Sequence, residues 1–196
     1  GNAFGTGWRI FLPAGVATGK LRIEMENLLA ELDLAFSPWR ADSVISRFNT
    51  GTARDMAVLP EIAEVTRAAL AIADASEGRF DPTVGPLVAR WGFGPIQDGK
   101  AGGWQRLAAG DRHVARIDPA STLDLCGIAK GHALDRMTAL LLDAGHDHFL
   151  ADLGGELAAR GRHPSGRIWQ VGIEDPRQEA DGLAGALCLD GMAVAT

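Results

Sequence analysis

The sequence predicts an α+β protein, and two observations carry that prediction. Three amphipathic segments lie in the first three quarters of the 196-residue chain, and a series of short strand-like segments follows them. Helices that precede a run of strands, without regular alternation of the two, are typical of the α+β class. With 46% hydrophobic residues, the chain has enough apolar side chains to bury a core, as one domain or as two intertwined halves.

Each predicted helix carries apolar residues at a spacing of about 3.6, the period that keeps them on one face. The first runs from Lys20 to Phe36, the second from Pro60 to a stop at Gly78, and the third from about Ala129 to Ala144. Proline is favoured in a first helical turn and glycine just after a last one, which supports the second assignment. The polar stretch from Arg40 to Arg54 is expected to be a loop.

Predicted strands alternate apolar and polar residues or are rich in β-branched and aromatic ones. The region from Gly92 to Asp118 has glycines, charges and little periodicity, so it is expected to be a surface connection with one or two short strands. The predicted strands are Trp8–Leu12, His148–Leu153, Glu156–Ala159, Ile168–Ile173, Leu183–Leu189 and Met192–Thr196.

Charge, hydropathy and cysteine content exclude several classes of function. The net charge of -6 leaves no basic surface to neutralise a nucleic-acid backbone, so no DNA or RNA partner is expected. No apolar run approaches the roughly 18 to 20 residues that cross a bilayer. The two cysteines, Cys126 and Cys188, match no metal or disulfide pattern and are expected to be small buried thiols, with a single disulfide left open.

The segment from Leu123 to Asp135 combines a carboxylate, a glycine-lined turn and a lysine at the start of a predicted helix. Asp124 precedes the turn, Gly127 lies in it, and Lys130 follows. A helix N-terminus presents free backbone N–H groups and the positive end of its dipole. We therefore expect an anion to bind here, most simply a phosphate.

A second segment, Gly78–Pro86, places two prolines and two glycines around Asp81 and Thr83. Such a backbone is rigid enough to aim the two polar side chains at a ligand. The same residues also fit an aspartate- or threonine-stabilised turn that leads into a helix, a structural interpretation that stays open at this point.

Four blocks of the sequence resemble motifs of the ApbE family of FAD:protein FMN transferases. DLCGIAKGHALD resembles the family's DLGGIAKGYAVD, and GRFDPTVGPL with the following WGFG resembles AFDPTVGPLV and WGFG. SPWRADSVISRFN is similar to S-x-(Tyr/Trp)-x-x-D-S-E-I-S-R-x-N, and the stretch from Leu153 to Pro176 is similar to GGDI…G…P-x-G-x-x-W-x-V-G-I-x-D-P. Two residues depart from the family pattern: Val44 replaces a Glu, and Phe4 replaces a Met near the flavin.

The resemblance implies a fold and an activity. The fold is the T-fold-like ApbE architecture, with antiparallel sheets packed against helices in a single domain over 1–196. The activity is magnesium-dependent transfer of FMN from FAD to a Thr or Ser hydroxyl of an acceptor flavoprotein, with release of AMP. Two alternatives stay open: an FAD-binding protein without turnover, and an FAD pyrophosphatase giving FMN and AMP.

The resemblance also implies site residues, whose family counterparts bind FAD or the metal. Gly127 would give magnesium its backbone carbonyl, a hard oxygen donor, and Trp39 would stack on the isoalloxazine ring. No residue is assigned as a catalytic base. The implied FAD-binding residues are Phe4, Trp39, Arg79, Phe80, Asp81, Asp124 and Lys130.

Location and completeness are further expectations from the family. Its members imply a periplasmic lipoprotein, anchored to a membrane through a segment not in this chain. Family chains continue past the position of Thr196 into an H-x-x-D-P-x-T-G segment whose Asp and Thr hold magnesium. The 196 residues are therefore expected to supply only part of the metal site.

Overall fold

The computed structural model describes residues 1–177 and 182–195 and divides into two compact units. The first unit comprises Gly1–Leu29 and Ala133–Thr196, and the second comprises Ala30–His132. The boundaries fall inside two helices, α1 (Gly19–Phe36) and α5 (Cys126–Asp143). Mixed helices and antiparallel sheets confirm the predicted α+β class, whereas the single domain stays a prediction.

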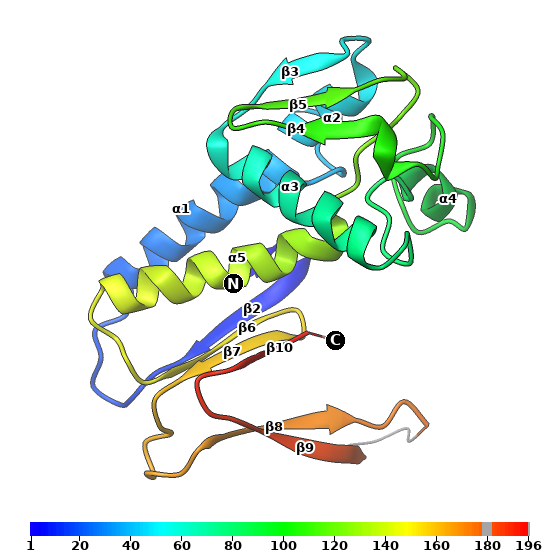
Figure 1. Cartoon of the computed structure of the whole chain (residues 1–196). Helices are drawn as coiled ribbons and strands as arrows, with labels where there is room; N and C mark the ends of the chain where they lie inside the picture. Colours follow the sequence, from blue (N-terminus) through cyan, green and yellow to red (C-terminus); the bar gives the residue numbers. More distant parts are fainter. Residues whose placement is uncertain (178–181, 196) are drawn as a thin grey trace. The chain divides into compact units, whose positions relative to one another are not determined.

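The first unit is built on a five-stranded antiparallel sheet with the order β1-β2-β6-β7-β10. Figure 1 shows the parts of α1 and α5 that belong to this unit covering one face of the sheet. The strands are β1 (Asn2–Ala3), β2 (Thr6–Phe11), β6 (Phe149–Leu153), β7 (Glu156–Arg160) and β10 (Ala193–Val194).

A hairpin of β8 (Trp169–Glu174) and β9 (Leu183–Leu189) forms a separate two-stranded sheet in the same unit. Trp169 and Leu189 are buried in one apolar cluster with Leu150 and Ala159 of β6 and β7. The hairpin therefore packs through side chains onto the five-stranded sheet. This packing explains why the residues that face the larger sheet are apolar, although the two strands hydrogen-bond only with each other.

Two tight turns in this unit have the geometry of two-residue hairpins. Phe4 and Gly5, between β1 and β2, both have positive φ, at 52° and 71°. Gly154 and Gly155, between β6 and β7, have φ of 58° and 94°. These values suit the type I′ turn, whose backbone follows the right-handed twist of the paired strands. A non-glycine residue such as Phe4 adopts a positive φ only at a cost in free energy, which the surrounding structure must offset.

The glycine pair also allows a close approach between strands. A Cβ on Gly154 would lie 2.4 Å from Thr6 Cγ2, and the Gly154 N–H donates to the Gly7 carbonyl at 3.0 Å. Two adjacent glycines permit a close backbone approach to a ligand or to another strand. The structure shows that β2 is the neighbour.

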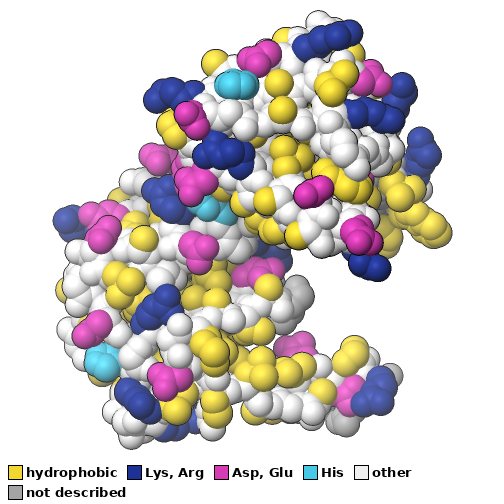
Figure 2. All heavy atoms as spheres, in the orientation of Figure 1, with side chains coloured by type: hydrophobic (Ala, Val, Ile, Leu, Met, Phe, Trp, Pro, Cys, Tyr) yellow, Lys and Arg dark blue, Asp and Glu magenta, His cyan; other side chains and the backbone are white. Residues whose placement is uncertain are grey.

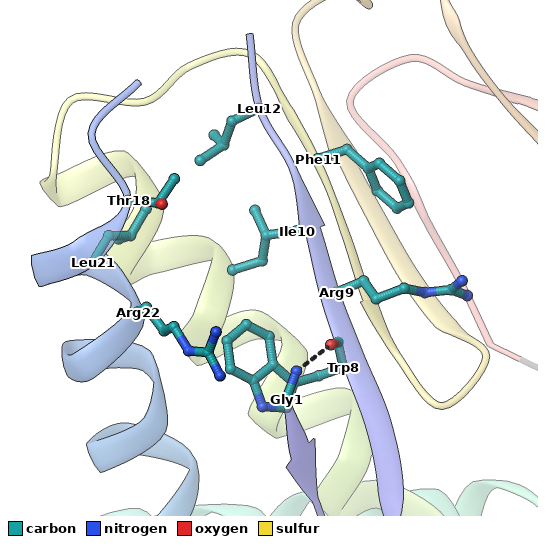
Figure 3. Close-up of a pocket in the computed structure, with 9 residues that line it drawn as sticks. All are labelled: Gly1, Trp8, Arg9, Ile10, Phe11, Leu12, Thr18, Leu21 and Arg22. Atoms are coloured by element: carbon teal, nitrogen blue, oxygen red, sulfur yellow. Dashed lines mark hydrogen bonds between the residues drawn. The ribbon is translucent and has the colours of Figure 1, made fainter. Parts of the chain in front are cut away.

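A cavity of about 380 Å³ lies between β2 and the start of α1 (Figure 3). Apolar side chains form most of its wall, and Gly1 lies over the Trp8 indole, donating from its amino group to the Trp8 carbonyl at 3.0 Å. The lining residues are Gly1, Trp8, Arg9, Ile10, Phe11, Leu12, Thr18, Leu21 and Arg22.

The second unit combines the three-stranded antiparallel sheet β3-β5-β4 with helices. Helix α3 contacts β4 and β5, and its buried face comes from residues spaced as predicted. The elements are α2 (Val44–Thr50), β3 (Asp55–Ala57), α3 (Pro60–Ala75), α4 (Gly85–Arg90), a 3₁₀ turn η1 (Trp104–Arg106), β4 (Leu107–Ala109) and β5 (His113–Arg116).

The stretch from Arg40 to Arg54 is not a loop, and the prediction for it was wrong. It contains α2, which begins after Ser43, whose Oγ accepts the Ser46 N–H at 3.0 Å. Ile45 and Phe48 are buried on its inner face. Seven residues give too short a window for helical periodicity to stand out, so the capping serine was the usable signal.

Other boundaries shift by a few residues. Helix α5 begins at Cys126, three residues before the predicted start at Ala129, and the short α4 is the helix that the structural interpretation of Gly78–Pro86 allowed. Two short strands, β4 and β5, confirm the expectation for the region from Gly92 to Asp118. Of the last predicted strand, Ala193–Val194 is β10, while Thr196 lies outside the described residues. Among the described residues, no helix is both long and apolar enough to cross a membrane.

Both cysteines are exposed and unpaired, which corrects the expectation of buried thiols. Cys126 opens α5, and Cys188 lies on β9, where the Gln170 side chain contacts its sulfur at 3.7 Å. Neither position belongs to the buried face of its element, so residue type alone misled the prediction.

Candidate functional site

The second unit brings together the two segments that the sequence singled out. The Asp124 N–H donates to the Pro82 carbonyl at 2.7 Å, although the two residues are far apart in the chain. A Cβ on Gly85 would lie 3.3 Å from Asp124 Oδ2, so this carboxylate also lies against the start of α4. The predicted anion-binding turn and the rigid proline-glycine segment therefore form one surface.

A second contact joins the same two segments through Phe80 and Gly127. The Phe80 ring lies over Gly127, where an added Cβ would come within 2.9 Å of Phe80 Cε2. Glycine is needed at this helix position because the aromatic ring occupies the space of a side chain. The Gly127 backbone consequently remains uncovered by any side chain of its own.

Asp81 forms the structural turn that its sequence context also allowed. Its Oδ1 accepts the Thr83 N–H at 2.8 Å and the Thr83 hydroxyl at 2.6 Å. Thr83 is buried, and the turn leads directly into α4. The turn fixes the carboxyl group in place, which suits both a structural role and the presentation of the group to a ligand.

Asp124 organises the start of α5. Its Oδ1 accepts the Cys126 N–H at 2.9 Å, while the Leu125 carbonyl accepts the first N–H groups of the helix, from Ile128 and Ala129. Because α5 starts at Cys126, Lys130 lies in the second helical turn and is half-buried. The predicted helix start at Ala129 placed Lys130 in the first turn, and that placement was wrong.

The Cys126 thiol is held protonated by this arrangement. Desolvation by the surrounding protein, the nearby Asp124 charge and a hydrogen bond to that carboxylate raise the pKa of Cys126 to about 12, with Lys130 opposing the shift. The residue reaches solvent, yet its sulfur is a hydrogen-bond donor to Asp124 rather than a nucleophile.

Trp39 is presented on the loop that follows α1. Its side chain is exposed, and its backbone N–H donates to Ser37 Oγ at 3.3 Å. Arg40 and Asp42 form an ion pair at 2.9 Å, and the hydrogen bond from Arg40 lowers the pKa of the Asp42 carboxyl. The loop is therefore fixed while the indole stays free to receive a flat ligand.

Arg116 was missed by the sequence analysis. Its buried guanidinium donates to the carbonyls of Gly51, Ala53 and Ser121 and lies over the Phe48 ring at 4.5 Å. Burial lowers the pKa of this guanidinium. It joins the end of α2 to the segment before Asp124, and no local pattern marks an arginine for such a role.

Two predicted site residues, Arg79 and Phe4, take no part in the contacts described so far. Arg79 is exposed, and its guanidinium contacts the Ser76 carbonyl at 3.4 Å. Phe4 belongs to the first unit, in the turn between β1 and β2.

Figure 2 shows hydrophobic side chains projecting over α4, where Leu87, Trp91 and Phe93 are exposed.

The sequence profile described as the ApbE family matches residues 4–196. The chain belongs to the ApbE family. A Vibrio cholerae relative named FAD:protein FMN transferase is 32% identical over 177 residues, covering 83% of this chain and 53% of the relative. One from Klebsiella pneumoniae with the same name is 29% identical and covers the whole chain, which spans 62% of that relative.

Solved structures agree with the family assignment. The flavin transferase ApbE from Vibrio cholerae superposes with a TM-score of 0.88 at 29% identity, covering 98% of this chain and 68% of that one. The ApbE protein of Thermotoga maritima gives a TM-score of 0.83 at 25% identity, covering 100% and 68%. The ApbE architecture expected from the sequence is thereby confirmed.

Few protein groups at the candidate site could bind magnesium. The Phe80 ring packs against Gly127 where a Cβ would lie, and the Asp124 carboxylate lies two residues before Cys126, the first residue of α5. Among the described residues, no group of three His, Cys, Asp or Glu side chains gathers around a point. These residues fit a magnesium ion through single oxygen donors, not through a full protein cage.

Gly127→Ala is expected to destabilise the chain by about 1 to 3 kcal/mol, because the new methyl group overlaps the Phe80 ring and outweighs the higher helix propensity of alanine. Gly131 in the same helix has no atom within 4 Å of an added Cβ and is the matched control. Gly131→Ala should be neutral or stabilising by up to about 1 kcal/mol. Urea denaturation measures both, and in a Phe80→Ala background the Gly127→Ala penalty should vanish. Equal effects of the two glycine changes would contradict the packing described.

Cys126 is expected to react slowly with iodoacetamide. Since the thiolate is the nucleophile, a thiol with a pKa raised to about 12 should be alkylated at pH 8 at least about 100-fold more slowly than free N-acetylcysteine. Mass spectrometry of a Cys188→Ser variant follows Cys126 alone, and its rate should still be rising at pH 10. Asp124→Asn removes the neighbouring charge and should increase the rate. A rate close to that of the free thiol would show that the Asp124 contact is absent in solution.

Proposed function

We propose that this chain carries the FAD-binding part of an FAD:protein FMN transferase. The chain transfers FMN from FAD to a Thr or Ser hydroxyl of an acceptor flavoprotein and releases AMP. Support comes from family membership and from relatives that bear this name, of which the chain spans 53% and 62% in the two cases described. The observation that carries the proposal is the junction of the Asp81 and Asp124 segments at the N-terminus of α5.

The reaction is a displacement at phosphorus. A P–O bond forms between the acceptor oxygen and the FMN phosphorus, and the P–O bond to the bridging diphosphate oxygen breaks. The bridging oxygen and its electron pair leave with AMP, and the acceptor hydroxyl loses its proton. Such a reaction depends on holding the attacking and leaving oxygens in line and on offsetting the diphosphate charge.

The chain's residues supply binding and orientation. The positive end of the α5 dipole and the Lys130 ammonium would face the diphosphate, and the segment Arg79–Asp81 would contact the dinucleotide. The Trp39 indole, exposed on its fixed loop, would stack on the isoalloxazine ring. Anchoring the two ends of FAD by different loops keeps the diphosphate between them.

Magnesium is proposed as the cofactor that reduces the charge on the diphosphate when bound. The Gly127 carbonyl would be this chain's ligand, and the phosphate oxygens of FAD would supply others. The packing of Phe80 on Gly127 supports this role only by fixing the backbone at residue 127.

The acceptor protein and the cellular location are also proposed. The acceptor is a flavoprotein that exposes a Thr or Ser hydroxyl, and the site of action is the periplasm, with membrane anchoring through a lipid-bearing segment outside these residues. Both follow from the family. Fractionation of cells into cytoplasm, periplasm and membranes would test the location, and recovery of the native protein in the cytoplasm would contradict it.

The activity is tested by in-gel flavin fluorescence of a purified acceptor after incubation with FAD and magnesium. Because the chain spans only part of its relatives, the assay uses both the 196-residue chain and a chimera that carries the C-terminal remainder of the Vibrio relative. The proposal expects the chimera to place flavin on the acceptor, with little or none from the 196-residue chain and none on an acceptor variant whose target Thr is changed to Ala. Free FMN without labelled acceptor indicates a pyrophosphatase, and tight FAD binding without turnover indicates a binding protein.

Trp39→Ala is expected to weaken FAD binding by about 1 to 3 kcal/mol, or about 5- to 150-fold in the dissociation constant, through loss of stacking. Trp91, another exposed tryptophan of the second unit, is the matched control, and Trp91→Ala should leave the affinity unchanged. Quenching of flavin fluorescence measures both constants. An unchanged affinity in a folded Trp39→Ala protein would remove Trp39 from the site.

A further inference from the structure

The backbone that leads into Asp124 is held by the side chain of Asn49. Asn49 Nδ2 donates to the Leu123 carbonyl, and the Leu123 N–H donates to Asn49 Oδ1, both at 2.8 Å. Leu123 is fully buried and belongs to neither a helix nor a strand. One side-chain amide thus provides the two hydrogen bonds that a neighbouring strand would otherwise provide.

Only a side-chain amide satisfies both groups of Leu123. Asn carries a donor and an acceptor side by side, whereas a carboxylate only accepts and an aliphatic side chain does neither. Because Leu123 is shielded from water, losing Asn49 would leave its N–H and its carbonyl without a partner, or would pull the segment outward to reach solvent.

Asn49 is held in place by the helix to which it belongs. It lies near the end of α2, a helix that Ser43 caps. Phe48 of the same helix is buried, and the Arg116 guanidinium packs on its ring. Asn49 binds the backbone of Leu123, and the Pro82 carbonyl accepts the N–H of Asp124, the next residue. Two neighbouring residues are therefore held by two different parts of the unit.

We propose that Asn49 is a positioning residue for the diphosphate site. It sets the place of Asp124 and, through it, the first turn of α5, without touching the ligand. The identity of the ligand rests on the proposed function, but the hold of Asn49 on the backbone does not. The arms of the experiment therefore separate the two.

The first arm uses the chain without ligand. Asn49→Ala should increase amide hydrogen exchange at Leu123, Asp124 and Cys126 at least about tenfold, because these groups open locally more often. Thr50→Ala is the matched control, since its hydroxyl bonds the Ser46 carbonyl within α2. Unchanged exchange at the three amides in a folded Asn49→Ala protein would overturn the proposal, whatever the chain binds.

The second arm compares FAD with riboflavin, which lacks phosphates. The proposal expects Asn49→Ala to weaken FAD binding at least about tenfold and riboflavin binding less than about twofold, because only the diphosphate contact is disturbed. Equal losses for both ligands would reduce Asn49 to a general structural role. Failure of the unmodified chain to bind FAD would count against the proposed function, while the first arm would still decide on Asn49.

Two further measurements cover a variant that fails to fold. Asn49→Asp keeps the size and the acceptor for the Leu123 N–H but loses the donor, so exchange at Leu123, Asp124 and Cys126 should increase relative to the unmodified chain, and unchanged exchange in a folded Asn49→Asp protein would overturn the proposal. In the unmodified chain, nuclear Overhauser effects between the Asn49 side-chain amide protons and the Leu123 amide proton should be strong. Their absence from a complete assignment would overturn the inference.

Discussion

The hydrogen bond from the Asp124 N–H to the Pro82 carbonyl is the contact on which the rest of the candidate site depends. It joins two irregular segments, which lack the ladders that hold strands and helices in place. Phe80 on Gly127 and the Asp124 carboxylate beside Gly85 lie around this bond, so the three contacts form one small junction. A site built from loops acquires rigidity only if its backbone groups find such partners.

The junction places chemically different groups at one helix start. Backbone N–H groups of α5, the Asp124 carboxylate and, one turn on, Lys130 lie together, while the high pKa of Cys126 keeps that thiol neutral. A neutral thiol adds no second negative charge to a place proposed to receive a diphosphate. The Asp124 charge that raises this pKa also opposes a bound anion, so diphosphate binding relies on Lys130 and on the proposed magnesium to offset that charge.

Motif residues have different tasks, and resemblance alone does not distinguish them. Asp81 is engaged in a turn with Thr83, Gly154 makes room for Thr6, and Asn49 holds the backbone of Leu123. Such residues keep a site in shape, whereas Trp39 is exposed to receive a ligand. Part of a family signature therefore reflects packing and hydrogen bonding.

The sequence by itself determined the α+β class, the long helices α1 and α3 and most strands, because periodic burial leaves its mark over many residues. It also located the segments around Asp81 and Asp124. Only the tertiary structure decided that these segments meet, that α2 interrupts the expected loop and that Asn49 and Arg116 join its end to the Asp124 segment. The physical reason is that the contacts of Asn49, Arg116 and Asp124 link residues distant in the chain, and that α2 is too short for its periodicity to stand out, so neither leaves a local pattern in the sequence.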